Sequence, residues 1–175
     1  MPIIRPLRGH IPEIGQDSFI AENATIIGQF KCGHGCSFWY GSVIRADVNA
    51  ITLGNNVNVQ DNATVHCTYE KFATVIGNNV SIGHNAIVHG CTIEDNVLIG
   101  MGAIVMDNCV VEEGCIVAAG AVVTSGTRLN AGTLWAGMPA KELGPVPERL
   151  RAGEIERIAN NYQKYSSWYK DGADE

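Results

Sequence analysis

Apolar residues recur at every sixth position along most of the chain, and most of them are Ile, Val or Leu. The repeat is interrupted by three additional residues after Ile44 and by five within Cys67–Val75, and one residue is dropped before Ile93. The repeating positions are Ile14, Ile20, Ile26, Cys32, Phe38, Ile44, Leu53, Val59, Val65, Ile76, Ile82, Val88, Ile93, Ile99, Val105, Val111, Val117, Val123, Leu129 and Trp135. A six-residue period is typical of a solenoid in which three short strands and three corners form one coil.

Each repeating residue is expected to point into the solenoid and its neighbours outward, because side chains alternate along a strand. The coils should stack at the roughly 4.8 Å spacing of paired strands. This pattern resembles the left-handed parallel β-helix of the hexapeptide-repeat proteins, and the left-handed sense comes from that resemblance alone. The predicted fold class is therefore all-β, with a left-handed β-helix domain over residues 1–140.

A different pattern follows the repeat, which ends at Gly137-Met138-Pro139. Pro147 stands where a helix would begin, and proline is favoured in the first helical turn. The apolar residues that follow recur mostly at steps of three or four, as in an amphipathic helix. They are Leu150, Ile155, Ile158, Tyr162, Tyr165 and Tyr169. We predict a C-terminal α-helix within residues 141–175 that packs on the outside of the solenoid.

Composition and charge argue against nucleic-acid binding and against a membrane protein. The net charge is −6, from 12 Lys+Arg and 18 Asp+Glu, whereas nucleic-acid partners require basic patches. No apolar run approaches the roughly 20 residues of a membrane span, and Met1–His10 has no signal-peptide core. We therefore expect no nucleic-acid or membrane partner and a cytoplasmic location. In that compartment the six cysteines are expected to be free thiols.

Two histidines fall on the same face of the predicted solenoid. His66 follows the inward Val65 and His89 follows the inward Val88, so both point outward, one coil apart. Their Cβ atoms should lie about 5 Å apart, as on neighbouring strands. At that separation two imidazoles can share a metal ion at about 2.0–2.1 Å from each nitrogen.

A third histidine, His84, falls on a different face and cannot easily reach that pair within its own chain. In a threefold ring, the face that carries the pair would meet the His84 face of the next copy, which predicts a homotrimer with an intersubunit metal site. Arg45 lies one coil below His66, and Asp61 lies one coil below His84 beside Gln60. The same docking would bring Arg45 of one subunit to Asp61 of the next.

The segment Cys32-Gly33-His34-Gly35-Cys36 looks like a second metal motif. The register instead directs both cysteines inward as small core residues, so we expect no metal there.

Several short segments around these residues match a known family closely. The sequences Arg45-Ala46-Asp47, Asn58-Val59-Gln60-Asp61-Asn62, Gly83-His84 and His89-Gly90, together with His66, resemble the γ-class carbonic anhydrases. The resemblance covers nearly the whole chain, through Gly137-Met138-Pro139-Ala140 and the C-terminal helix. Acyltransferases with the same repeat do not carry this set of residues.

The resemblance implies a metal-dependent lyase. It assigns His66 and His89 of one subunit and His84 of its neighbour as metal ligands, with zinc as the metal and Fe²⁺ or Co²⁺ as alternatives, because imidazole binds several transition metals. A zinc-bound hydroxide would then hydrate carbon dioxide reversibly to bicarbonate. The resemblance also implies roles for six other side chains: Gln60 orients the water or substrate, Arg45 and Asp61 form an intersubunit ion pair, Asp47 and Asn58 give polar support, and Tyr162 approaches the site.

The sequence departs from the best-studied branch of that family at the proton-transfer residues. Val48 stands where that branch has a glutamate, and the loop Cys67–Phe72 is short, with Glu70 as its one acid. Slow proton release would weaken hydration of carbon dioxide. Three alternatives remain open: metal-dependent hydrolysis of an acyl-CoA thioester, metal-free acyl transfer from acyl-CoA, and a binding trimer with a structural metal. Three protein ligands argue against the last, because structural zinc sites usually have four.

Overall fold

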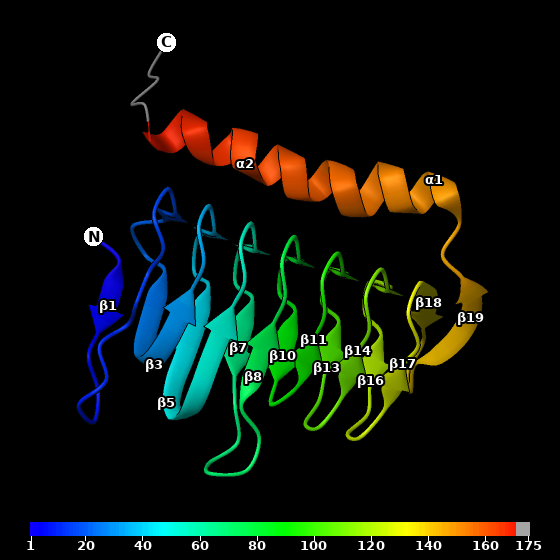
Figure 1. Ribbon diagram of the computed structural model, residues 1–175, viewed down its shortest axis with the longest axis horizontal. Coiled ribbons are helices and arrows are strands. Elements are labelled where there is room, and N and C mark those ends of the chain that lie inside the picture. The colour runs from blue at the N-terminus through cyan, green and yellow to red at the C-terminus, as the bar shows by residue number, and fades with distance from the viewer. Residues whose placement is uncertain (171–175) are drawn as a thin grey trace.

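The computed structural model describes residues 1–170, apart from the side chain of Ala152. It is a parallel β-solenoid of about 7 turns followed by a C-terminal helix (Figure 1), which confirms the predicted left-handed β-helix with a helix appended. The expected subdivision at residue 140 stays a prediction, because solenoid and helix pack together.

Two of the three solenoid faces form one sheet. The long strands β3 and β5 run through a corner and join these faces into an eleven-stranded sheet within residues 1–170. Its strands are β1 (Ile3–Arg5), β3 (Thr25–Cys32), β5 (Val43–Leu53), β7 (Thr64–His66), β8 (Thr74–Ile76), β10 (Ile87–His89), β11 (Thr92–Ile93), β13 (Ile104–Val105), β14 (Val110–Val111), β16 (Val122–Val123) and β17 (Arg128–Leu129).

The third face is a separate sheet of eight strands in the described part of the chain. Its strands are β2 (Phe19–Ile20), β4 (Ser37–Phe38), β6 (Asn58–Val59), β9 (Ser81–Ile82), β12 (Leu98–Ile99), β15 (Ile116–Val117), β18 (Thr133–Ala136) and β19 (Lys141–Pro145). All neighbours are parallel except β18 and β19. The sequence pattern did not anticipate β19, which folds back on the last coil before the helix begins.

The core is a column of the repeating residues. All of the twenty predicted inward positions are buried except Ile14, Ile20 and Trp135, which are partly buried at the two ends of the column. Because strands in register place equivalent residues in line, each inward Ile or Val packs against those of the coils above and below. The predicted register is therefore confirmed along the solenoid.

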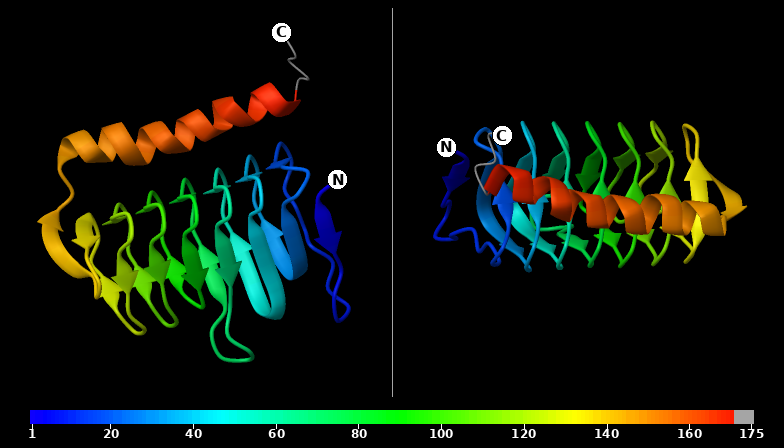
Figure 2. Two further views of the ribbon diagram at one scale, coloured as in Figure 1. Left: turned by 180° about the vertical axis from the view of Figure 1, so that it is seen from behind. Right: turned by 90° about the horizontal axis from the view of Figure 1, so that it is seen from above.

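The C-terminal helix runs back along the solenoid, opposite to the direction in which the coils advance (Figure 2). It comprises α1 (Glu148–Leu150), a π-helical segment (Arg151–Glu156) and α2 (Arg157–Lys170). Aromatic pairs hold α2 to the first coils, with ring centroids 5.2 Å apart for Trp39 and Tyr162 and 5.3 Å apart for Phe19 and Tyr169. This packing places Tyr162 over the middle of the solenoid.

Candidate metal centre

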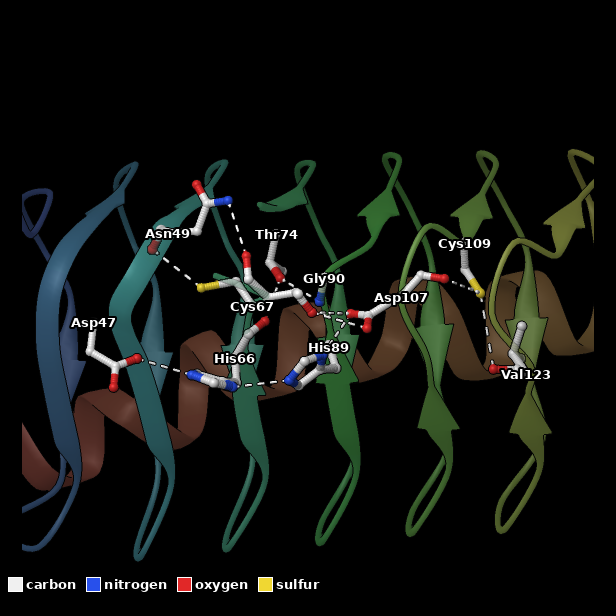
Figure 3. Close-up of polar contacts among 11 residues, drawn as sticks. Asp47, Asn49, His66, Cys67, Thr74, His89, Gly90, Asp107, Cys109 and Val123 are labelled. Carbon is white, nitrogen blue, oxygen red and sulfur yellow. Dashed lines mark hydrogen bonds and ion pairs between the residues drawn. The ribbon is translucent and has the colours of Figure 1, made fainter. Parts of the chain in front are cut away.

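His66 ends β7 and His89 ends β10, and the two are direct partners in the parallel pairing of these strands. Their ring centroids lie 4.9 Å apart. Nδ1 of His66 and Nε2 of His89 face each other at 2.9 Å (Figure 3). The predicted stacking of the two imidazoles on one face is thus confirmed.

The other nitrogen of each ring is held by a carboxylate. Nε2 of His66 lies 3.0 Å from Oδ1 of Asp47, and Nδ1 of His89 lies 2.7 Å from Oδ1 of Asp107. The four side chains form a row across the strands, with the histidines in the middle (Figure 3). A neutral imidazole has one N–H, so an N–H donated to each carboxylate leaves two lone pairs facing each other. A cation between them would remove that repulsion, and this arrangement fits a metal site.

His84 repeats the pattern on the other sheet. It lies in the turn after β9, and its Nδ1 is 2.8 Å from Oδ2 of Asp61. Its Nε2 faces the hydroxyl of Tyr162 at 3.4 Å. Carboxylates that accept from the second ring nitrogen are the usual partners of metal-binding histidines, because they fix the ring and its tautomer. All three predicted ligands therefore carry such a partner.

Asp107 was not identified from the sequence. Its carboxylate accepts from His89 and also from the hydroxyl of Thr68, whose Oγ1 lies 2.9 Å from Oδ1 and 3.0 Å from Oδ2. Asp107 follows His89 by 18 residues, one more than the 17 residues of this coil, in which Val88 pairs with Val105. The register alone therefore places Met106, not Asp107, next to His89, and the contact of Asp107 with Thr68 depends on the path of the loop between β7 and β8.

Gln60 and Asn58 belong to a buried chain of hydrogen bonds. Gln60 Nε2 donates to Asn58 Oδ1 at 2.9 Å, and Asn58 Nδ2 donates to Ser81 Oγ at 2.7 Å. Both amides are almost fully buried. The chain fixes the side chain of Gln60, which lines the same groove as His84.

Arg45 pairs with Asp47 through the carboxylate oxygen that does not face His66. Burial raises the pKa of Asp47, but hydrogen bonds from His66 and Arg45 outweigh it, so the pKa lies below its usual value. Burial lowers the pKa of His66 in spite of the hydrogen bond to Asp47. A lowered pKa favours the neutral imidazole, which is the form that binds a metal.

Tyr162 sits between the helix and the site. Burial, and then the nearby charge of Asp61, raise its pKa to about 12. Its hydroxyl is therefore protonated at neutral pH and can donate a hydrogen bond. The structure brings Tyr162 to His84, in line with the approach to the site that the sequence resemblance implied.

Within residues 1–170 of one chain, no three His, Cys, Asp or Glu side chains converge as a metal site would require. His66 and His89 end two strands of the eleven-stranded sheet, whereas His84 lies in the turn after β9 of the eight-stranded sheet. The intersubunit site and the ion pair between Arg45 and Asp61 of neighbouring subunits stay predictions. Within the chain, Arg45 pairs with Asp47 and Asp61 pairs with His84.

Two other groups of residues were also singled out in the sequence. Cys32 and Cys36 are buried free thiols, as their register predicted. Val48 and Glu70 line a polar cavity of about 280 Å³ that also reaches Asp47. Glu70 thus lies on the same cavity as a carboxylate that contacts His66.

None of the helical segments in residues 1–170 has the length and apolar character that crossing a bilayer requires. Comparison with protein families finds the bacterial transferase hexapeptide family (six repeats), whose model matches residues 73–103 and 90–125. This agrees with the six-residue period of the regular coils.

Several curated relatives are named carbonic anhydrases. The chain is 39% identical to the carbonic anhydrase of Geobacillus kaustophilus over 96% of this chain and 91% of the relative. It is 42% identical to the mitochondrial gamma carbonic anhydrase 1 of Arabidopsis thaliana over 89% of this chain, but it spans only 57% of the length of that relative. Among solved structures, a hexapeptide transferase family protein from Anaplasma phagocytophilum matches with a TM-score of 0.90 and 43% identity, covering 95% of this chain and 98% of that one.

Proposed function

The chain belongs to the γ-class carbonic anhydrase family, and we propose that it is a metal-dependent lyase that hydrates carbon dioxide reversibly. The proposed site lies between subunits of a homotrimer, with His66 and His89 from one copy and His84 from the next. Zinc is the proposed metal, with Fe²⁺ or Co²⁺ as alternatives.

One observation carries this proposal: each of the three histidines holds one ring nitrogen against a carboxylate, and the other ring nitrogen faces no carboxylate. The nitrogens turned away from the carboxylates are Nδ1 of His66 and Nε2 of His89, which face each other, and Nε2 of His84, which faces the hydroxyl of Tyr162. When bound, zinc held by three imidazoles lowers the pKa of a coordinated water towards about 7 and so supplies hydroxide at neutral pH.

The side chains around the site have separate tasks in this proposal. Gln60 uses its Nε2 on Asn58, so its Oε1 is left to accept a hydrogen bond from the attacking water and to orient it. The hydroxyl of Tyr162, which stays protonated at neutral pH, donates to a substrate oxygen. Asp47, Asp61 and Asp107 hold the imidazole rings. The ion pair of Arg45 with Asp47 offsets charge beside the site.

Proton release is the weak step of this proposal. Hydration of carbon dioxide forms one C–O bond and releases one proton, which must leave the site in every cycle. Val48 cannot accept it, and Glu70 is exposed on the loop. Turnover is therefore expected to be low in weak buffer and to rise with the concentration of a proton-accepting buffer.

The proposal is tested by metal content, native mass and carbon dioxide hydration, measured together on wild type, His84→Ala and His34→Ala. His34 is an exposed histidine in another turn and serves as the matched control. We expect a trimer with about one metal ion per chain. The metal and the hydration activity should be lost in His84→Ala and kept in His34→Ala.

Three results would overturn the proposal. A monomer that binds metal, or a His84→Ala trimer with its full metal content, would remove the intersubunit site. A metal-free trimer that binds acyl-CoA would instead support metal-independent acyl transfer; AntD of Bacillus cereus, which has a similar fold, is named an N-acyltransferase.

A further inference from the structure

A groove separates the C-terminal helix from the eight-stranded sheet and begins at the candidate metal centre. Its volume is about 450 Å³. Gln60 and His84 line one end. On the helix, the groove is also lined by Glu154 and Arg157, whose side chains pair at 3.1 Å. Carbon dioxide has three atoms, whereas grooves of roughly 300–1,000 Å³ accommodate much larger ligands.

The wall of the groove is apolar along successive coils. Leu98 on β12 and Ile116 on β15 point outward from the sheet, and Ile158 and Tyr165 line the groove from the helix. Met101 extends the row of turn residues above His84 and is 59% exposed. From β9 to β15 the groove crosses two strand spacings, about 10 Å. An apolar wall of this length suits a flexible chain of methylene groups.

The helix spans this groove as a bridge. The rings of Phe19 and Trp39 hold its C-terminal half, and β19 holds its beginning through the antiparallel pairing with β18. The glycines at positions 83 and 100 line the sheet side and add no side chains to fill the space. The groove therefore stays open because the helix is anchored at both ends and the sheet below it carries no side chains at these two positions.

We propose that the groove binds the straight aliphatic chain of an acyl substrate whose carbonyl carbon lies beside His84. The inference rests on the proposed function for the chemistry at the carbonyl and names activated acyl compounds as a substrate class of that same site. In the reaction, the oxygen of water bonds to the acyl carbon, the C–S bond of a thioester breaks, and the sulfur leaves as a thiol. The products are a carboxylate, a thiol and one proton.

Chain length is the direct test. Saturated fatty acids from four to twelve carbons are titrated into the purified protein by calorimetry, and the matching N-acetylcysteamine thioesters are assayed for thiol release. Each added methylene should strengthen binding about fourfold until the groove is full. The KM of the thioesters should fall along the same series. We call the gain in affinity per added methylene the chain-length slope. If fatty acids show this slope but no thioester releases thiol, the substrate assignment would be overturned and only a fatty-acid site would remain.

Variants separate the groove from the metal centre. Leu98→Gln keeps the side-chain size but makes the wall polar, and it should weaken binding of the longest chains about tenfold or more. Ile116→Gln is the second variant on the same wall. Val75→Gln on β8, an exposed outward position of the other sheet, is the matched control and should leave the slope unchanged. Melting temperatures establish that each variant is folded.

The two proposals fail in different ways. Affinity that does not depend on chain length, in a trimer that binds metal and hydrates carbon dioxide, would overturn the groove and leave the proposed function standing. A normal chain-length slope in metal-free His84→Ala would support the groove independently of the metal. Equal slopes in Leu98→Gln, Ile116→Gln and wild type would overturn the assignment to this groove.

Discussion

The regular coils and the interrupted coils of the solenoid differ in what they carry. From β11 to β17 every strand has two residues and the six-residue period is unbroken. From β5 to β10 the period is broken twice, once inside the 11-residue strand β5 and once in the loop between β7 and β8. His66, His84 and His89 all lie in the interrupted coils. The regular coils add Asp107, whose carboxylate contacts His89.

The difference shows how one repeat serves two purposes. An unbroken repeat stacks identical coils, so its outward positions form even rows and its inward positions form a dense column. An insertion shifts the chain locally and brings polar groups beside a strand, as Asp47 lies beside His66 and Thr68 beside Asp107. The regular coils should therefore govern stability, and the interrupted coils the site.

The largest effect is expected inside the regular coils. Val117 is fully buried, and Val117→Asp would place an unpaired charge in the core column. We expect a loss of several kcal/mol, roughly the whole stability of a domain of this size, and therefore insoluble or unfolded protein. Soluble expression and circular dichroism measure this outcome.

The control is the same substitution on an outward residue of the same coils. Thr92 is exposed on β11, and Thr92→Asp should fold normally. If both variants folded with similar melting temperatures, the regular coils would not have the role assigned to them here.

Much of this fold could be predicted from the sequence, because a six-residue period fixes which side chains point inward. The same register placed His66 beside His89 and Asp61 beside His84, and both contacts are present. Contacts that depend on insertions could not be predicted in this way. The hydrogen bond from Thr68 to Asp107 depends on the path of the loop between β7 and β8, which the six-residue register does not give.

A smaller effect, confined to the interrupted coils, is expected at Asp107. Asp107→Asn keeps the shape of the side chain but weakens the acceptor that holds Nδ1 of His89. Loss of such a carboxylate typically lowers metal affinity about 10–100-fold. Competition with a chromophoric zinc chelator measures the affinity, and the melting temperature of the metal-free protein should be nearly unchanged.

A matched control tests whether position, and not charge, causes this effect. Glu142→Gln removes an exposed carboxylate on β19, far along the chain from the site, and should leave metal affinity unchanged. Equal affinities in Asp107→Asn and Glu142→Gln would mean that Asp107 has no part in holding the metal-binding ring.

The smallest effect separates backbone strain from contact with the site, and it compares two glycines. Gly90 and Gly120 both have positive φ, +54° and +69°, so alanine at either position costs about 1–2 kcal/mol of strain. A Cβ on Gly120 would meet no atom within 4 Å, whereas one on Gly90 would collide with the carboxylate of Asp107. Both variants should melt at a lower temperature, but only Gly90→Ala should also bind zinc more weakly, because it displaces Asp107 from His89. Weaker zinc binding in Gly120→Ala as well would show that general loosening of the coils, and not the position of Asp107, controls the affinity.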